Sequence, residues 1–135
     1  MTLINAEQGA LRLEELVRGL LFVSESDSPI RVVKLGLLPE LDERAFSKAL
    51  GKPEGTSVTR HSLGELFDRC VADQDWHGPT ERATLERYRR LVAFLGEALA
   101  DTRVFRIGQI AVEAYALGKT SDGSWLGVAT TLVET

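Results

Sequence analysis

The spacing of hydrophobic residues changes near Val104, and this change limits the possible folds more than any other feature. Before Val104, apolar residues recur every three or four positions in several segments, which is typical of helices. From Val104 onward they alternate with other residues, and turn residues at Gly108-Gln109 and at 118–123 divide this part into three strands. Helices followed by hairpins indicate an α+β domain with a largely antiparallel sheet and a C-terminal β-meander.

Four segments have helix signals. Asn5 is in position to cap the first helix, and apolar residues at helical spacing over 13–21 predict that it ends at the turn-forming cluster 24–29. Ser62 and Glu65 have the spacing of a capping box. Besides the first helix, we expect helices over 41–50 and 62–70 and a longest helix from Pro79 to about residue 99, with short strands at 30–35 and 58–59.

The composition is that of a single globular domain covering residues 1–135. The chain is 44% hydrophobic and 27% charged, and its length suits one core of about 100–150 residues. It has no apolar run of the ~20 residues that span a bilayer and no secretory signal, so we expect a cytoplasmic protein without a membrane partner. Its net charge of −4 argues against direct nucleic-acid binding but favours a partner with a basic cleft.

Cys70, His61 and His77 are the side chains that an enzyme would use as nucleophile and base. Cys70 falls at the end of an apolar helix, where a buried structural cysteine is the simpler interpretation. The two histidines and single cysteine form no zinc pattern, and residues 118–120 lack the preceding glycine of a phosphate-binding loop. We therefore expect no enzyme and no cofactor; a cysteine-dependent enzyme is the alternative that alkylation of Cys70 would test.

Other positions point to protein contacts. Trp76 lies among polar residues, so it is either a loop tryptophan folded onto the core or an interface anchor. Glu25 is either a solvated acid or part of a contact. The sequence ends two residues after the last predicted strand, and we expect Glu134 and Thr135 to be held there, where their oxygens can imitate a phosphate or approach Mg²⁺.

Several segments together resemble the nuclease A inhibitor family, small bacterial proteins that block a sugar-non-specific DNA/RNA endonuclease. The segments that carry the resemblance are residues 20–29, Gln74-Asp75-Trp76, residues 104–108 and Val133-Glu134-Thr135. They occur in the family's order and at similar spacing. The resemblance does not extend to residues 36–60, and residues 77–80 replace a more acidic stretch that follows the tryptophan in the family.

The resemblance implies a three-layer α-β-α sandwich that inhibits a Mg²⁺-dependent, sugar-non-specific nuclease. The residues that would contact the nuclease are Glu25, Gln74, Trp76 and Thr135. In the complex Thr135 would reach the catalytic Mg²⁺ of the nuclease and displace a metal-bound water. Glu25 would engage the metal's surroundings or the basic side chains that hold the substrate phosphate, with Gln74 and Trp76 beside the cleft. The alternative is an interaction module of the same fold whose partner is not a nuclease.

Overall fold

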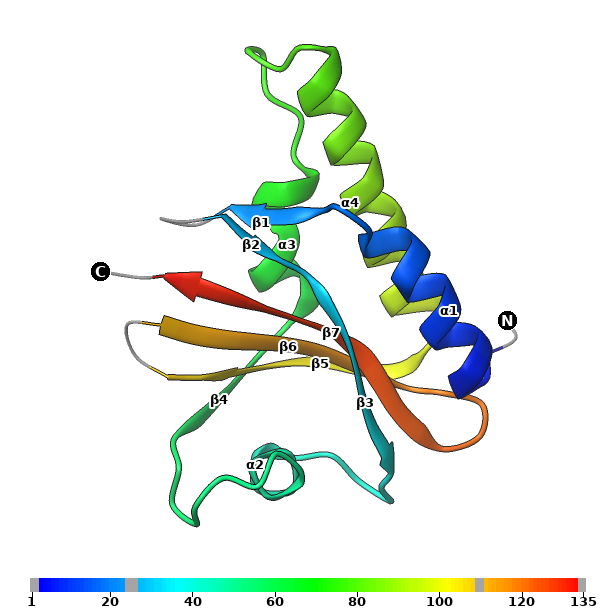
Figure 1. Ribbon diagram of the computed structural model, residues 1–135, viewed down its shortest axis with the longest axis vertical. Helices are drawn as coiled ribbons and strands as arrows, with labels where there is room; N and C mark the ends of the chain where they lie inside the picture. Colours follow the sequence, from blue (N-terminus) through cyan, green and yellow to red (C-terminus); the bar gives the residue numbers. More distant parts are fainter. Residues whose placement is uncertain (1–2, 24–26, 109–110, 134–135) are drawn as a thin grey trace.

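A computed structural model describes residues 3–23, 27–108 and 111–133, and it contains an antiparallel five-stranded sheet in the order β3-β7-β6-β5-β4 (Figure 1). A separate hairpin pairs β1 with β2. The helices are α1 (Ala6–Val17), α2 (Glu43–Ala49), α3 (Leu63–Val71) and α4 (Pro79–Glu97). The strands are β1 (Leu21–Val23), β2 (Asp27–Pro29), β3 (Arg31–Leu37), β4 (Val58–His61), β5 (Ala100–Ile107), β6 (Ala111–Lys119) and β7 (Ser124–Val133).

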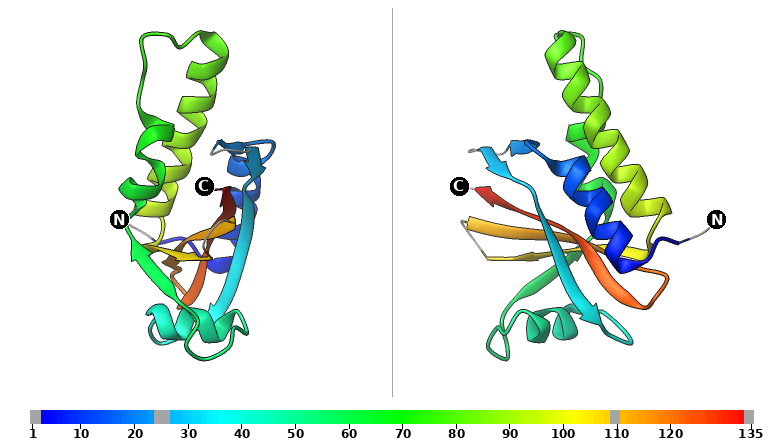
Figure 2. Two further views of the ribbon diagram at one scale, coloured as in Figure 1. Left: turned by 90° about the vertical axis from the view of Figure 1, so that its left-hand side faces the viewer. Right: turned by 45° about the vertical axis from the view of Figure 1, so that its right-hand side comes forward.

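Helices cover both faces of the sheet, which confirms the α+β class and the α-β-α layering. α1, α3 and α4 lie on one face, and α2 lies on the other (Figures 1 and 2). On the first face, Leu13 and Leu91 are fully buried in a core shared with β-strand residues. On the second, the ring of Phe46 in α2 stacks on Phe105, with centroids 4.6 Å apart, and meets Tyr115 edge-on. The two cores therefore hold the three layers together.

The predicted C-terminal meander is confirmed. β5, β6 and β7 pair in sequence, and β7 also pairs with β3. In the β6–β7 hairpin, Ala111 lies opposite Val133 at one end and Lys119 opposite Trp125 at the other. The first described residues of the chain bond to the turn at one end of this hairpin, and the last described residue, Val133, lies at its other end.

The helix starts agree with the sequence signals. The side chains of Asn5, Asp42 and Ser62 each accept a hydrogen bond from the backbone N–H three residues on, as N-caps do. Pro79 is the first residue of α4. Gly51, with a φ of 72°, follows the C-cap of α2, a conformation that glycine adopts without a steric penalty.

The prediction for the end of the first helix is wrong. α1 ends at Val17 because the chain turns at Gly19, where φ is 70°. Leu20 is buried beyond the helix, and Leu21 begins β1 instead of continuing the helical face. The backbone oxygen of Leu21 accepts a hydrogen bond from the Tyr88 hydroxyl, so α4 fixes the start of the hairpin.

None of the helices in the described parts of the chain is long and apolar enough to cross a bilayer.

Candidate protein-interaction site

Gln74 and Trp76 lie in the loop of residues 72–78, which joins α3 to α4 at one end of the molecule (Figures 1 and 2). Trp76 is 74% exposed. The interpretation in which this tryptophan folds onto the core is therefore wrong. Gln74 is also exposed, and the loop offers one amide and one indole to a partner.

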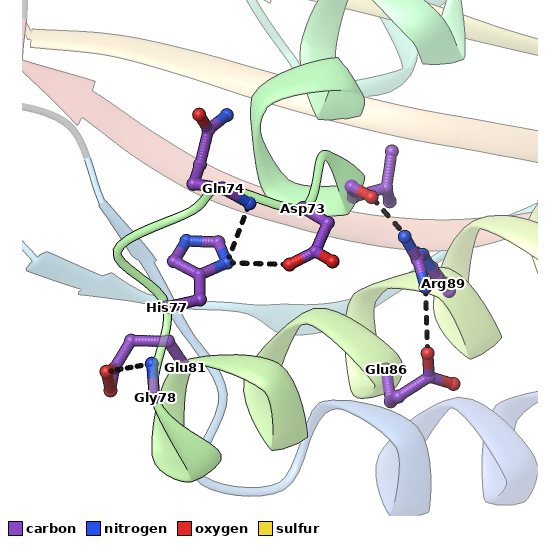
Figure 3. Close-up of polar contacts among 8 residues, drawn as sticks. Asp73, Gln74, His77, Gly78, Glu81, Glu86 and Arg89 are labelled. Carbon is purple, nitrogen blue, oxygen red and sulfur yellow. Dashed lines mark hydrogen bonds and ion pairs between the residues drawn. The ribbon is translucent and has the colours of Figure 1, made fainter.

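The two helix ends that flank the loop are fixed by side chains of α4 (Figure 3). Arg89 donates from Nε to the backbone oxygen of Val71 at 3.2 Å and pairs with Glu86 at 2.9 Å. Glu81 accepts a hydrogen bond from the backbone N–H of Gly78 at 3.0 Å. Both ends of the loop are therefore attached to the same helix, which restricts the orientations open to Trp76.

His77 fixes the inside of the loop. Its backbone N–H donates to the Gln74 carbonyl at 3.0 Å, and its Nδ1 accepts from the Gln74 N–H at 3.2 Å. Its ring meets the Trp76 ring edge-on, with centroids 4.4 Å apart, while its side chain is 11% exposed. From the sequence, His77 was considered as a catalytic base or a zinc ligand, not as a residue that orders the loop. Nothing in the polar sequence of this loop indicated that the side chain of His77 would bond back to the Gln74 backbone.

The positions predicted for Glu25 and Thr135 lie outside the described residues. The described strands next to them in the sequence contact one another: the hairpin of β1 and β2 lies beside the end of β7 (Figures 1 and 2). Thr130 of β7 donates to the Pro29 carbonyl at 3.1 Å, and both hairpin strands contact β7. Within the described residues, the loop of Gln74 and Trp76 stands apart from these strand ends. Of the predicted site, the structure describes Gln74 and Trp76, which share this loop.

The side chains considered for catalysis have other surroundings. Burial raises the pKa of the Cys70 thiol to about 11, which keeps it protonated and unreactive near neutrality. His61 lies between Thr59 and Glu65, at 2.9 and 3.1 Å, and its hydrogen bond lowers the pKa of the Glu65 carboxyl. The same Glu65 completes the capping box of α3. Among the described residues, no three His, Cys, Asp or Glu side chains are grouped to hold a metal.

An open groove lies between α2 and the loop that follows it, at the opposite end of the molecule from the loop that joins α3 to α4 (Figure 1). Arg44, Lys48 and Lys52 line it together with Glu43 and Glu54. Arg44 and Glu54 are 3.8 Å apart, both almost fully exposed. Charges of both signs on an exposed wall define no particular ligand.

A scan against known protein families matches residues 8–135 to the nuclease A inhibitor-like proteins. The chain belongs to this family. The match confirms the resemblance seen in the sequence and covers nearly the whole chain, including residues 36–60, where inspection of the sequence found no likeness. A comparison with curated proteins found no significant match. The family membership fits a protein that acts by binding another protein.

Proposed function

We propose that this nuclease A inhibitor-like protein inhibits a Mg²⁺-dependent, sugar-non-specific nuclease in the cytoplasm and catalyses nothing itself. The observation that carries the proposal is the family match over residues 8–135. The geometry supports it through Trp76, which is exposed on a loop attached at both ends to α4. A large aromatic side chain held in one place is the usual centre of a protein interface.

In the proposed mechanism, the C-terminal end blocks the active site of the nuclease. Thr135 enters the cleft, and its oxygens approach the Mg²⁺ of the nuclease in place of water, since Mg²⁺ prefers oxygen ligands. Glu25 faces the metal's surroundings or the basic side chains that bind the substrate phosphate. The support for this arrangement is that β7 and the β1–β2 hairpin, from which the two residues extend, contact each other.

Gln74 and Trp76 make the second part of the proposed contact, beside the cleft. The net charge of −4 assists encounter with a nuclease whose cleft is basic, because complementary charge raises the association rate. An acidic protein also binds nucleic acid poorly, which fits an inhibitor that binds the enzyme and not its substrate.

The test is a titration of a purified Mg²⁺-dependent, sugar-non-specific nuclease with the purified protein, measured as residual cleavage of DNA and of RNA. We expect cleavage of both to stop at a stoichiometric ratio. The protein alone should cleave neither and should retain no labelled DNA at physiological salt. Full nuclease activity in excess protein would favour the alternative of an interaction module with another kind of partner.

A further inference from the structure

The Nδ1 atom of His77 has two neighbours that it cannot satisfy together. The backbone N–H of Gln74 donates to it at 3.2 Å, which requires Nδ1 to carry no proton. Oδ1 of Asp73 lies 3.5 Å away and can only accept, which requires Nδ1 to carry one (Figure 3). Whether Nδ1 carries a proton therefore decides which of the two interactions is made, and in the charged ring both nitrogens carry one.

The choice between these partners affects both described residues of the proposed contact. In the neutral tautomer that leaves Nδ1 unprotonated, the His77 side chain closes the turn onto Gln74, and its ring packs edge-on with the ring of Trp76. With protonated His77, the Gln74 N–H loses its acceptor, and the ring is drawn toward Asp73. A turn that loses one of its two closing hydrogen bonds is less well ordered, so a partner must then order it at a free-energy cost.

We propose that His77 is the positioning residue of the contact loop, and that its neutral form holds Gln74 and Trp76 in the arrangement that binds the nuclease. The inference rests on the proposed function. Protonation of His77 lowers affinity by releasing the loop. Inhibition is therefore stronger when the ring is neutral than when it is charged.

A pH effect on inhibition can be attributed to His77 by comparison with the other histidine of the chain. The charged residues nearest His77 are acids: Asp73 lies 3.5 Å from Nδ1, and Glu81 in the first turn of α4 bonds the next residue, Gly78. Asp75 is the other charged residue of the loop. Histidine is the side chain that changes charge between about pH 5 and pH 8, and the chain has two. The other, His61, is bonded to Thr59 and Glu65 at β4 and α3, which makes it a matched control.

The first measurement needs no nuclease. In the free protein, NMR follows the imidazole of His77 and the backbone amide of Gln74 from about pH 8 to about pH 5. We expect both signals to move with one midpoint in the wild type and in His61→Asn. In His77→Asn, whose Oδ1 can accept the same N–H but cannot be protonated, the Gln74 amide should no longer follow pH. A Gln74 amide that stays still while His77 titrates would overturn the inference.

The second measurement is inhibition of the nuclease by the wild type, His77→Asn, His77→Leu and His61→Asn. Near pH 8 we expect His77→Asn to inhibit nearly as well as the wild type and His77→Leu, which has no acceptor, about tenfold less well. Toward pH 5 the wild type should become a weaker inhibitor than His77→Asn, by about fivefold or more, the lower range of a coupling free energy. His61→Asn should follow the wild type at every pH.

The two ideas can fail separately. If the wild type inhibits no nuclease, the proposed function fails, and the NMR titration still decides whether His77 controls Gln74. If the wild type inhibits but its ratio to His77→Asn is constant with pH, the positioning role fails while the inhibitor assignment stands. Thermal unfolding of each variant checks that the differences do not come from loss of the fold.

Discussion

Trp76 exposes 74% of its surface to water, although its indole is a large apolar group. We predict that Trp76→Ala weakens nuclease inhibition by about 2 kcal/mol or more, roughly a 30-fold increase in Kd, as for the centre of an interface. The thermal unfolding midpoint should not change, because the exposed side chain contributes little burial to the fold. Inhibition titrations and thermal melts measure the two quantities.

Leu37→Ala is the matched control for the tryptophan. Leu37 is also 74% exposed but lies at the end of β3, on the opposite side of the molecule from the loop of Trp76 (Figure 1). Its truncation should leave inhibition unchanged. If the two variants lose inhibition equally, general surface hydrophobicity and not Trp76 drives association.

The Cys70 thiol should make the stability of the fold depend on pH. Burial raises its pKa from 9.0 to about 11, so the folded state holds this proton more tightly than the unfolded state does. The resulting stabilisation is complete below about pH 9 and is lost as the pH rises toward about 11. Burial also raises the pKa of Tyr88, which acts in the same direction. Denaturant unfolding at increasing pH should show this loss, and Cys70→Ala should reduce it.

Alkylation of Cys70 checks the same thiol chemically. At neutral pH the native protein should react slowly with iodoacetamide, because the thiolate is the nucleophile and burial disfavours it. The denatured protein should react at the rate of an ordinary cysteine. Rapid reaction of the native protein would revive the interpretation of Cys70 as a catalytic nucleophile.

The chemistry of single residues could be predicted from the sequence only in part. Trp76 stood out because no apolar period includes it, but composition alone favoured a place on the core over its observed exposure. His77 gave no signal, since its role depends on a turn that brings its Nδ1 back to the Gln74 N–H. Whether the contacts predicted for Glu25 and Thr135 are made stays a prediction.

At the scale of elements, the glycines of β7 and α4 should respond in opposite ways to a methyl group. Gly127 lies opposite Leu117 in the sheet, and a Cβ there would overlap the carbonyl oxygen of Ala116. We predict that Gly127→Ala destabilises the fold by about 3 kcal/mol, the upper range for overpacking, because two hydrogen-bonded strands must separate. Denaturant unfolding measures the loss.

Gly96→Ala is the control for glycine replacement. In α4 the nearest atom to an added Cβ is a side-chain carbon of Leu63, 3.9 Å away, so the methyl group fits. Alanine is a better helix former, and the variant should be more stable by about 0.5–1 kcal/mol. If Gly96→Ala also destabilises the fold, the loss in Gly127→Ala cannot be assigned to the clash in β7 alone.

The elements themselves were predictable where a local signal fixed them. Capping side chains located the starts of α1 and α3, and alternation located β5 to β7. The β1–β2 hairpin was missed because Leu20 and Leu21 continue the helical spacing past Gly19. Its strands have three residues each, too few to show a period, and its place is set by contacts with β7 and Tyr88 that are distant in the sequence.

At the scale of the whole molecule, the first and last described segments lie at opposite ends of the β6–β7 hairpin. Ile4 is bonded through its backbone to Ala98 and Ser121, beside the turn between these strands. Val133 pairs with Ala111 at the other end of the hairpin. The proposed mechanism uses only the Val133 end, so the two ends of the chain should tolerate additions differently.

We predict that residues added after Thr135 abolish or severely weaken inhibition, whereas the same residues added before Met1 do not. If Thr135 occupies the nuclease cleft, the space beside the metal cannot also hold a tag, while Ile4 lies at the far end of the hairpin. Thr135→Ala should have an intermediate effect, since it removes the hydroxyl but keeps the main chain. The measurement titrates one nuclease with the three variants and compares their thermal unfolding, which should be nearly unchanged because terminal residues contribute little burial. Equal inhibition by the two tagged proteins would exclude insertion of the C-terminal end, and the exposed loop of Trp76 would then be the remaining part of the proposed contact.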